Sequence, residues 1–131
     1  MDEEEGAAAE TSVERISAVT LLTGRMAEAV AFYQALGFRL LYGGAQAPFT
    51  SFGVGEGYLN LQADATAPRR EPIWGRVIFW VTDVDATYQR ALRAGFTAES
   101  APADASWGER YFHIRDPDGH ELSFAHPLSP P

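Results

Sequence analysis

Two stretches decide the fold of this chain: VTLLTGRMAEAVAFYQALGF (Val19–Phe38) and VIFWVTDVDATYQRALRAGF (Val77–Phe96). They align without a gap at an offset of 58 positions. Each begins with a short run of strand-forming residues, continues with apolar residues at helical spacing, and ends on Gly-Phe. A repeat of this kind predicts two copies of one structural unit. Chance similarity between two amphipathic segments is the alternative interpretation.

The helical part of each copy has recognisable boundaries. Asp83 is a candidate N-cap of the second helix, and Asp85 is favourable in its first turn. Gly37 and Gly95 stand where a left-handed C-terminal cap is expected. The apolar residues at helical spacing are Met26, Val30 and Tyr33 in the first copy and Val84, Tyr88 and Ala91 in the second. The sequence therefore predicts a strand followed by a helix, twice.

Beyond each helix the pattern changes to the alternation of strands. FTSFGVGEGYLNLQ (residues 49–62) predicts a hairpin that turns at its glycines. RYFHIRDPDGHELSFA (residues 110–125) turns at Asp-Pro-Asp-Gly, a strong turn sequence. The predicted fold class is therefore α+β, with two βαβββ modules.

The length of 131 residues fits one domain. We expect an acidic disordered tail over residues 1–14, one domain over 15–127 and a C-terminal tail over 128–131. Within the domain, module one covers residues 15–65, a linker covers 66–73 and module two covers 74–127.

Charge and missing residue types exclude several functions. The net charge is −8, but six of the eighteen acidic residues and none of the ten arginines lie in residues 1–14, so the rest carries only −2. The acidic balance argues against nucleic acid as a partner. The chain has no cysteine and no lysine, which excludes thiol nucleophiles and Schiff bases. No apolar run is long enough to span a membrane, so we expect no membrane partner and a cytoplasmic location.

The chain resembles the vicinal oxygen chelate superfamily, which contains glyoxalase I, extradiol dioxygenases, fosfomycin-resistance proteins and bleomycin-resistance proteins. The resemblance rests on AVAFYQALGFRL (Ala29–Leu40), VTDVDATYQRALRAGF (Val81–Phe96), WGERYFHIRDPDGHELSFAHP (Trp107–Pro127) and YLNLQ. It covers nearly all of residues 15–127. The resemblance implies that the two modules form an open, roughly eight-stranded barrel-like cleft. It also implies a homodimer.

The resemblance further implies a divalent metal held by one residue on the first and one on the last strand of each module. Here those positions carry Ala18, Asn60, Arg76 and Ser123. Alanine has no donor atom, arginine is cationic, and an amide and a hydroxyl are poor ligands for a transition metal. We therefore expect no metal and no cofactor, as in the bleomycin-resistance-like branch.

Alternation along the strands predicts which side chains line the cleft. The predicted ligand-binding residues are Trp80, Trp107, Arg76, Arg110, Phe112, Tyr58, Asn60, Ser123 and Glu121. The other inward positions are Ala18, Thr20, Leu22, Gln62, Ile78 and Ile114. The tryptophans offer flat surfaces to an aromatic or cationic ligand. The low charge of residues 15–131, however, removes acidity as an argument for a cationic ligand such as bleomycin.

Two interpretations of Arg76 remain open: it binds an anionic ligand, or it pairs with Glu121 inside the protein. The three histidines, His113, His120 and His126, are expected on the helix side of the sheet or at its ends, as structural or surface residues. Tyr33 is expected to pack within its helix.

The favoured function is binding of a small organic molecule without a metal, with sequestration of an antibiotic as one form of it. Three alternatives remain. The first is a metal-dependent lyase, isomerase or dioxygenase of the same superfamily. The second is a metal-free enzyme in which Arg76 stabilises an oxyanion and Glu121 acts as base, and these two are the only catalytic candidates. The third is an interaction module with a vestigial cleft.

Overall fold

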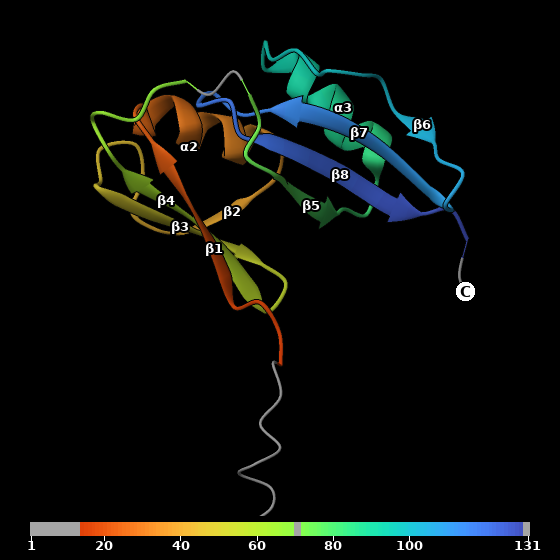
Figure 1. The fold of residues 1–131 in the computed structure, drawn as a ribbon, viewed down its shortest axis with the longest axis horizontal. Coiled ribbons are helices and arrows are strands. Elements are labelled where there is room, and N and C mark those ends of the chain that lie inside the picture. The colour runs from red at the N-terminus through yellow and green to blue at the C-terminus, as the bar shows by residue number, and fades with distance from the viewer. Residues whose placement is uncertain (1–13, 70–71, 130–131) are drawn as a thin grey trace, which may run out of the picture.

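The two sequence repeats fold into two modules of the same design. A computed structural model describes residues 14–69 and 72–129, so the predicted acidic tail lies outside it except for Glu14. Module one contains β1 (Ala18–Thr23), α2 (Met26–Ala35), β2 (Arg39–Tyr42), β3 (Phe49–Val54) and β4 (Gly57–Ala63) (Figure 1). Module two contains β5 (Arg76–Trp80), α3 (Val84–Arg93), β6 (Ala103–Asp104), β7 (Glu109–Arg115) and β8 (Glu121–Pro127).

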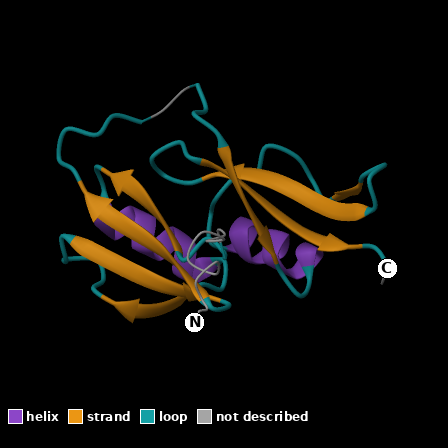
Figure 2. Cartoon of the chain, turned by 60° about the horizontal axis from the view of Figure 1, so that its bottom comes forward, coloured by secondary structure: helices purple, strands orange, loops and turns teal. Residues whose placement is uncertain are grey.

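Each module forms its own four-stranded sheet. The strand order is β1-β4-β3-β2 in the first sheet and β5-β8-β7-β6 in the second. In each, the first strand runs parallel to the last strand of the module, and the other pairs are antiparallel. Both helices lie on the same side of the two sheets (Figure 2). This confirms the predicted α+β fold with two βαβββ modules, and the sheets remain open.

The helix boundaries follow the residues that predicted them. Asp83 caps α3: its side chain accepts a hydrogen bond of 3.0 Å from the backbone N–H of Ala86. Gly37 and Gly95 follow the two helices with φ of +104° and +92°, a conformation that side chains other than glycine rarely adopt. Both predictions are confirmed. By contrast, α2 begins at Met26, and Arg25 at its N-cap position makes no capping side-chain hydrogen bond, so the stability of α2 depends more on packing.

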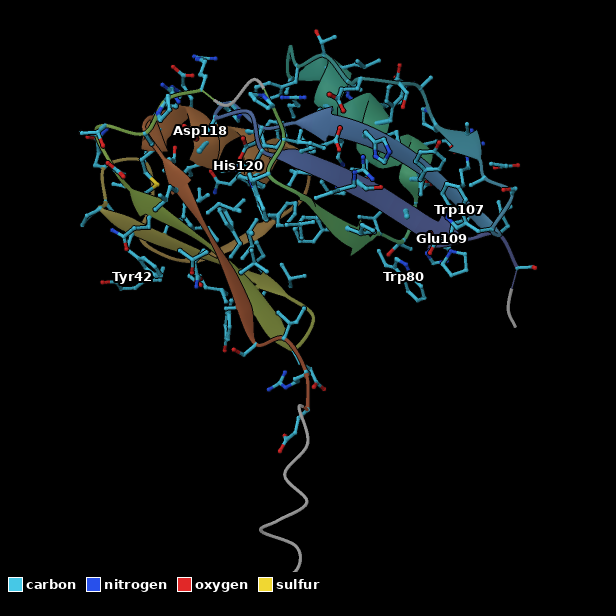
Figure 3. The ribbon with its side chains drawn as sticks, in the orientation of Figure 1. Tyr42, Trp80, Trp107, Glu109, Asp118 and His120 are labelled. Carbon is cyan, nitrogen blue, oxygen red and sulfur yellow. The ribbon has the colours of Figure 1, made fainter. Side chains whose placement is uncertain are left out.

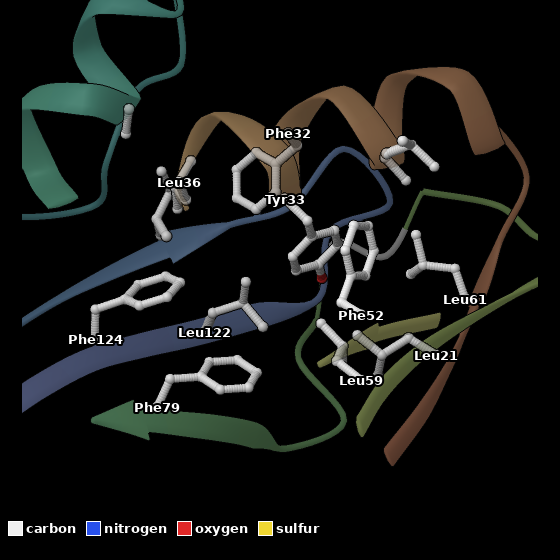
Figure 4. Close-up of a cluster of buried hydrophobic side chains, with 14 of the residues drawn as sticks. Leu21, Phe32, Tyr33, Leu36, Phe52, Leu59, Leu61, Phe79, Leu122 and Phe124 are labelled. Carbon is white, nitrogen blue, oxygen red and sulfur yellow. The ribbon is translucent and has the colours of Figure 1, made fainter. Parts of the chain in front are cut away.

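One hydrophobic core joins the modules. Buried side chains of α2 and of both sheets meet between the helices and the strands (Figure 4). The ring of Phe38, from module one, lies 4.9 Å from that of Phe79, from module two. Phe32 lies 4.9 Å from Phe96 in the same way. Because these aromatic contacts cross the boundary between modules, neither module buries its apolar face alone.

Buried polar contacts fix the turn between β7 and β8 against α2. The Tyr33 hydroxyl donates a hydrogen bond of 2.6 Å to the Asp116 carboxylate. Asp118 pairs with Arg25 and accepts a hydrogen bond of 2.9 Å from the N–H of Gly24. Tyr33 is fully buried, as expected of a residue that packs within the protein. The turn of module two therefore holds the first turn of the module-one helix in place.

Candidate functional site

No helix covers the faces of the two sheets that point away from α2 and α3, and we call them the open face. In the middle of the second sheet, however, Glu121, Ser123 and Ala125 of β8 are buried on that face. On the second sheet, the register places three rows of side chains there, running across β5, β8 and β7. These rows are Arg76–Glu121–Arg115, then Ile78–Ser123–His113, then Trp80–Ala125–Tyr111. The rows change from charged to aromatic along the strands. The open face therefore offers different chemistry at its two ends.

The open face of the first sheet carries mainly small and polar side chains. Thr20, Leu22, Tyr58 and Gln62 are exposed there, while their neighbours in sequence point into the core, as alternation predicts. Asn60 is half-buried and donates a long hydrogen bond of 3.3 Å to Thr20.

Where β1 and β4 approach β5, a crevice of about 350 Å³ opens. Its lining includes Ala18 and Tyr58 from module one and Ile78 from module two. The crevice therefore brings together residues from both predicted halves of the cleft. Arg76 and Trp80 are not part of its lining.

The predicted face of β7 is wrong. Phe112 pairs with Phe124 across the strands, is fully buried and stacks on that ring at 5.5 Å, on the core side. Ile114 is buried likewise. Arg110 points toward α3, where it bonds to Asp85 at 2.8 Å. The cause is a shift of one residue in the expected register of the Asp-Pro-Asp-Gly turn, which moves every side chain of a strand to the other face.

The same shift brings His113 to the open face, against expectation. It pairs with Ser123, not Leu122, and lies in the row between the charged and the aromatic rows. Burial, and then the nearby positive charge of Arg76, lower the pKa of His113. Its Nδ1 atom is buried without a hydrogen-bond partner among the described residues. A neutral imidazole is therefore available beside Arg76 and Glu121.

The other two histidines are held by structural hydrogen bonds, in agreement with the expectation. His120 is buried; its Nδ1 accepts a hydrogen bond of 2.8 Å from the Trp74 indole, so its Nε2–H donates to the carbonyl of Leu22 at 2.8 Å. His126 Nδ1 lies 2.8 Å from the carbonyl oxygen of Val81. Both ring nitrogens of His120 are therefore occupied.

Arg76 pairs with Glu121, which is one of the two interpretations that the sequence left open. The guanidinium Nε and Nη2 atoms lie 2.7 and 2.6 Å from the same carboxylate oxygen. A hydrogen bond with Glu99 and then the contact with Arg76 lower the pKa of Glu121, against the opposing effect of burial. The charges of Arg76 and Glu121 balance each other, so Arg76 has little unmatched positive charge to offer an anionic ligand.

The four family metal positions do not fit a metal ion. Ala18 offers no donor atom and Arg76 is held as a cation against Glu121. Asn60 and Ser123 supply only neutral oxygen donors. Within residues 14–69 and 72–129, no group of three or more histidine or acidic side chains is placed to hold a metal. We therefore assign no chemistry to a metal at this place.

The aromatic end of the open face contains a residue that the sequence reasoning missed. Glu109 accepts a hydrogen bond of 3.1 Å from each of two indoles, Trp80 through Oε2 and Trp107 through Oε1 (Figure 3). Both tryptophans are 67% exposed. Alternation from Tyr111 and His113 would have placed Glu109 on this face, had the β7 register been right.

None of the helices in the described part of the chain is long and apolar enough to cross a membrane.

Known proteins resemble this chain over parts or all of its length. An uncharacterized protein of Mycobacterium bovis is 52% identical over 48 residues, which are 37% of this chain and 32% of that protein. The match thus spans about a third of the length of the curated relative.

Solved structures resemble the whole fold. TioX from Micromonospora sp. ML1 superposes with a TM-score of 0.69 at 27% identity, over 88% of this chain and all of TioX. A bleomycin-binding protein complexed with bleomycin superposes with a TM-score of 0.66 at 21% identity, over 87% of this chain and 98% of that one. The second likeness, at that identity, shows the fold alone.

A family model covers both modules of the chain. It describes the Glyoxalase/Bleomycin resistance protein/Dioxygenase superfamily and matches residues 15–124, which include both helices and all strands except the end of β8. That range is most of the chain. The chain therefore belongs to the Glyoxalase/Bleomycin resistance protein/Dioxygenase superfamily.

Proposed function

We propose that this protein binds a small organic molecule on its open face without a metal ion, and that it sequesters the molecule without transforming it. The observation that carries the proposal is the set of side chains at the four metal positions, Ala18, Asn60, Arg76 and Ser123. Lewis-acid chemistry of the family needs a metal that these residues are unsuited to hold. An antibiotic is one class of ligand consistent with the proposal.

The exposed aromatic side chains support an organic ligand. Trp80 and Trp107 are large apolar surfaces that folding leaves uncovered, and such surfaces commonly mark ligand or protein interfaces. At the crevice, Tyr58 and Ile78 are also exposed, by 49% and 59% respectively. The half-buried amide of Asn60 would orient the molecule, whereas Ser123 is buried.

A thermal-shift panel tests the proposal. Chelator-treated protein is heated with divalent metals, with aromatic antibiotics including bleomycin, and with small carboxylates, because a ligand that binds only the folded state raises Tm. We expect an organic compound to raise Tm and the metals to leave it unchanged. Stoichiometric manganese, nickel, iron or zinc in protein purified without chelators would contradict the proposal. The absence of any shift would favour an interaction module.

The variant Arg76→Ala, tested with the same panel, shows whether the charged end of the open face binds an anionic ligand. A carboxylate whose shift disappears in the variant binds through Arg76. Arg39→Gln, an exposed arginine on β2, is the matched control.

A second candidate function is metal-free acid–base catalysis, and the position of His113 favours it. The sequence had offered only Arg76 and Glu121 for this work, whereas the structure adds a histidine with a lowered pKa in the adjacent row. A neutral imidazole is a suitable general base. If a turnover is found and survives Arg76→Ala, Glu121→Gln and His113→Gln unchanged, this candidate fails.

We also propose that the protein pairs as a homodimer, in the cytoplasm. Exposed apolar side chains on the open face support pairing, because a second copy of the chain would cover them. Leu22 and Ile78 are 38% and 59% exposed. Cell fractionation tests the location.

A further inference from the structure

The two exposed tryptophans of the open face are held by one carboxylate. Each oxygen of Glu109 accepts one indole N–H, from Trp80 and from Trp107, at 3.1 Å. Both indoles are two-thirds exposed, and these bonds favour one orientation of each ring. Figure 3 shows the three side chains together at the end of β5, β7 and β8.

The strands supply a platform around this arrangement. Ala125 lies between Trp80 and Tyr111 in the register and is buried. Trp107 packs against Tyr111, with ring centroids 5.5 Å apart. Three aromatic rings therefore surround one acidic side chain on the same face of the sheet.

Glu109 has no cationic partner among the residues that the structure describes, in contrast to its neighbours. Arg110 pairs with Asp85 and Asp104 on the other side of the sheet. Arg76 pairs with Glu121 at the other end of the open face. The negative charge of Glu109 is therefore balanced only by two indole N–H dipoles.

This combination is suited to a positive charge. A carboxylate has about four acceptor sites, and the two indoles occupy one on each oxygen. The faces of indole rings attract cations, tryptophan most strongly of the aromatic side chains. A cation placed beside Glu109 and over the face of one indole would meet both attractions together, whereas an anion would meet repulsion.

We propose that Trp80, Trp107 and Glu109 form a binding site for an organic cation, a quaternary ammonium or protonated amine carried on an aromatic or apolar body. The inference rests on the proposed function and specifies the charge of its ligand. In the sequence, Arg76 suggested an anionic ligand. Arg76 is paired with Glu121, whereas Glu109 at the aromatic end of the open face keeps a negative charge that favours a cationic ligand.

Three matched probes test the charge preference: benzyltrimethylammonium, which is cationic, benzyl alcohol, which is neutral, and phenylacetate, which is anionic. Binding is followed through the indole N–H signals in nitrogen-15 NMR spectra, assigned with single tryptophan-to-phenylalanine variants. We expect benzyltrimethylammonium to move the signals of Trp80 and Trp107 and to leave that of Trp74 in place. The other two probes should bind more weakly.

Glu109→Gln is the decisive variant, because it keeps the shape and one acceptor oxygen and removes the charge. We expect it to weaken benzyltrimethylammonium binding about tenfold and to leave benzyl alcohol unchanged. Glu28→Gln removes the same charge from α2, where Glu28 is 61% exposed, and should change nothing. Circular dichroism melting of each variant checks that it is folded.

The outcomes separate this inference from the function on which it rests. Equal binding of the three probes, or cation binding that Glu109→Gln leaves intact, overturns the cation site. So does failure of benzyltrimethylammonium to bind while another compound of the thermal-shift panel raises Tm, and in that case the proposed function stands. If neither the probes nor any panel compound binds, both fail.

Discussion

Single side chains explain why the open face differs at its two ends. At one end Arg76 and Glu121 neutralise each other within 2.7 Å. At the other end Glu109 holds two indoles and has no cationic partner within the described ranges 14–69 and 72–129. Each arrangement contains one carboxylate, but only the carboxylate of Glu109 keeps a charge that a cationic ligand could neutralise. The charge of a neighbouring residue, more than the residue type itself, decides what each carboxylate can bind.

At the residue scale, Tyr33→Phe tests the buried contact with Asp116. The variant leaves the Asp116 carboxylate without its donor, so we expect the free energy of unfolding to fall by about 1–3 kcal/mol at pH 8. Burial, and then the charge of Asp116, raise the pKa of Tyr33 well above its usual value of 10. Its stabilising effect is therefore complete below pH 10 and is lost as the pH rises further.

The difference between wild type and Tyr33→Phe should accordingly shrink between pH 8 and pH 11 in urea denaturation. The absence of lysine makes this range simple to interpret, since few groups besides tyrosines titrate there. Tyr42→Phe, at a tyrosine that is 67% exposed, is the control and should behave as wild type. A difference that stays constant with pH would contradict the assignment.

A second prediction at this scale concerns His113. Its pKa is lowered by burial and next by Arg76, so Arg76→Gln should raise the pKa toward 6.5, with burial still holding it below that value. Proton NMR of the imidazole during a pH titration measures the shift. Arg39→Gln, on β2 in the other module, should have no effect. An unchanged pKa in Arg76→Gln would show that the two side chains do not interact.

At the scale of elements, both helices could be predicted because their signals are local. Asp83 marks the start of α3 through its side-chain cap, and Gly95 marks its end through its positive φ. Both residue types are visible in the sequence. The register of β7 against β8 could not be predicted in the same way. It depends on how the Asp-Pro-Asp-Gly turn closes, and there Asp116 bonds to Tyr33 of α2 and Asp118 bonds to Gly24, just before α2, in the other module.

The error of one residue had consequences for the site. It placed Phe112 and Arg110 on the open face and removed His113 and Glu109 from it. The predicted faces of β1, β4 and β5 needed no such register, since successive side chains of a strand point to opposite faces. Contacts between distant parts of the chain therefore limited the prediction of the site more than the prediction of the fold.

The cap of α3 gives a prediction at the scale of an element. Asp83→Ala removes the acceptor for the Ala86 N–H, so the free energy of unfolding should fall by about 1 kcal/mol. Asp83→Asn keeps an acceptor of the same reach and should cost much less. Urea denaturation compares the two variants. Equal losses in both would mean that the charge of Asp83, and not its hydrogen bond, stabilises the helix.

At the scale of the whole molecule, the two modules behave as one folding unit with a shared core. Aromatic contacts between Phe38 and Phe79 and between Phe32 and Phe96 cross the boundary, as do the contacts of the β7–β8 turn with α2. The core lies on the helix side, and the opposite side remains available for a ligand or a second copy. This separation lets the open face vary without loss of the fold.

The proposed homodimer gives a prediction at this scale. Sedimentation velocity at micromolar concentrations should show a species of twice the chain mass of 14.3 kDa. Ile78→Asp places a charge among the exposed apolar residues of the open face and should shift the species toward the monomer if that face contributes to pairing. A monomer at every concentration would contradict the proposal.

Native mass spectrometry tests metal-free binding of an organic molecule most directly, because one spectrum reports the chain, any retained metal and any bound compound. Protein purified without chelators is measured alone and with an organic compound that raises Tm in the thermal-shift panel. The account predicts a chain free of metal that gains one organic molecule per subunit. A spectrum with one divalent metal per chain, or with no organic molecule bound at saturation, would contradict it.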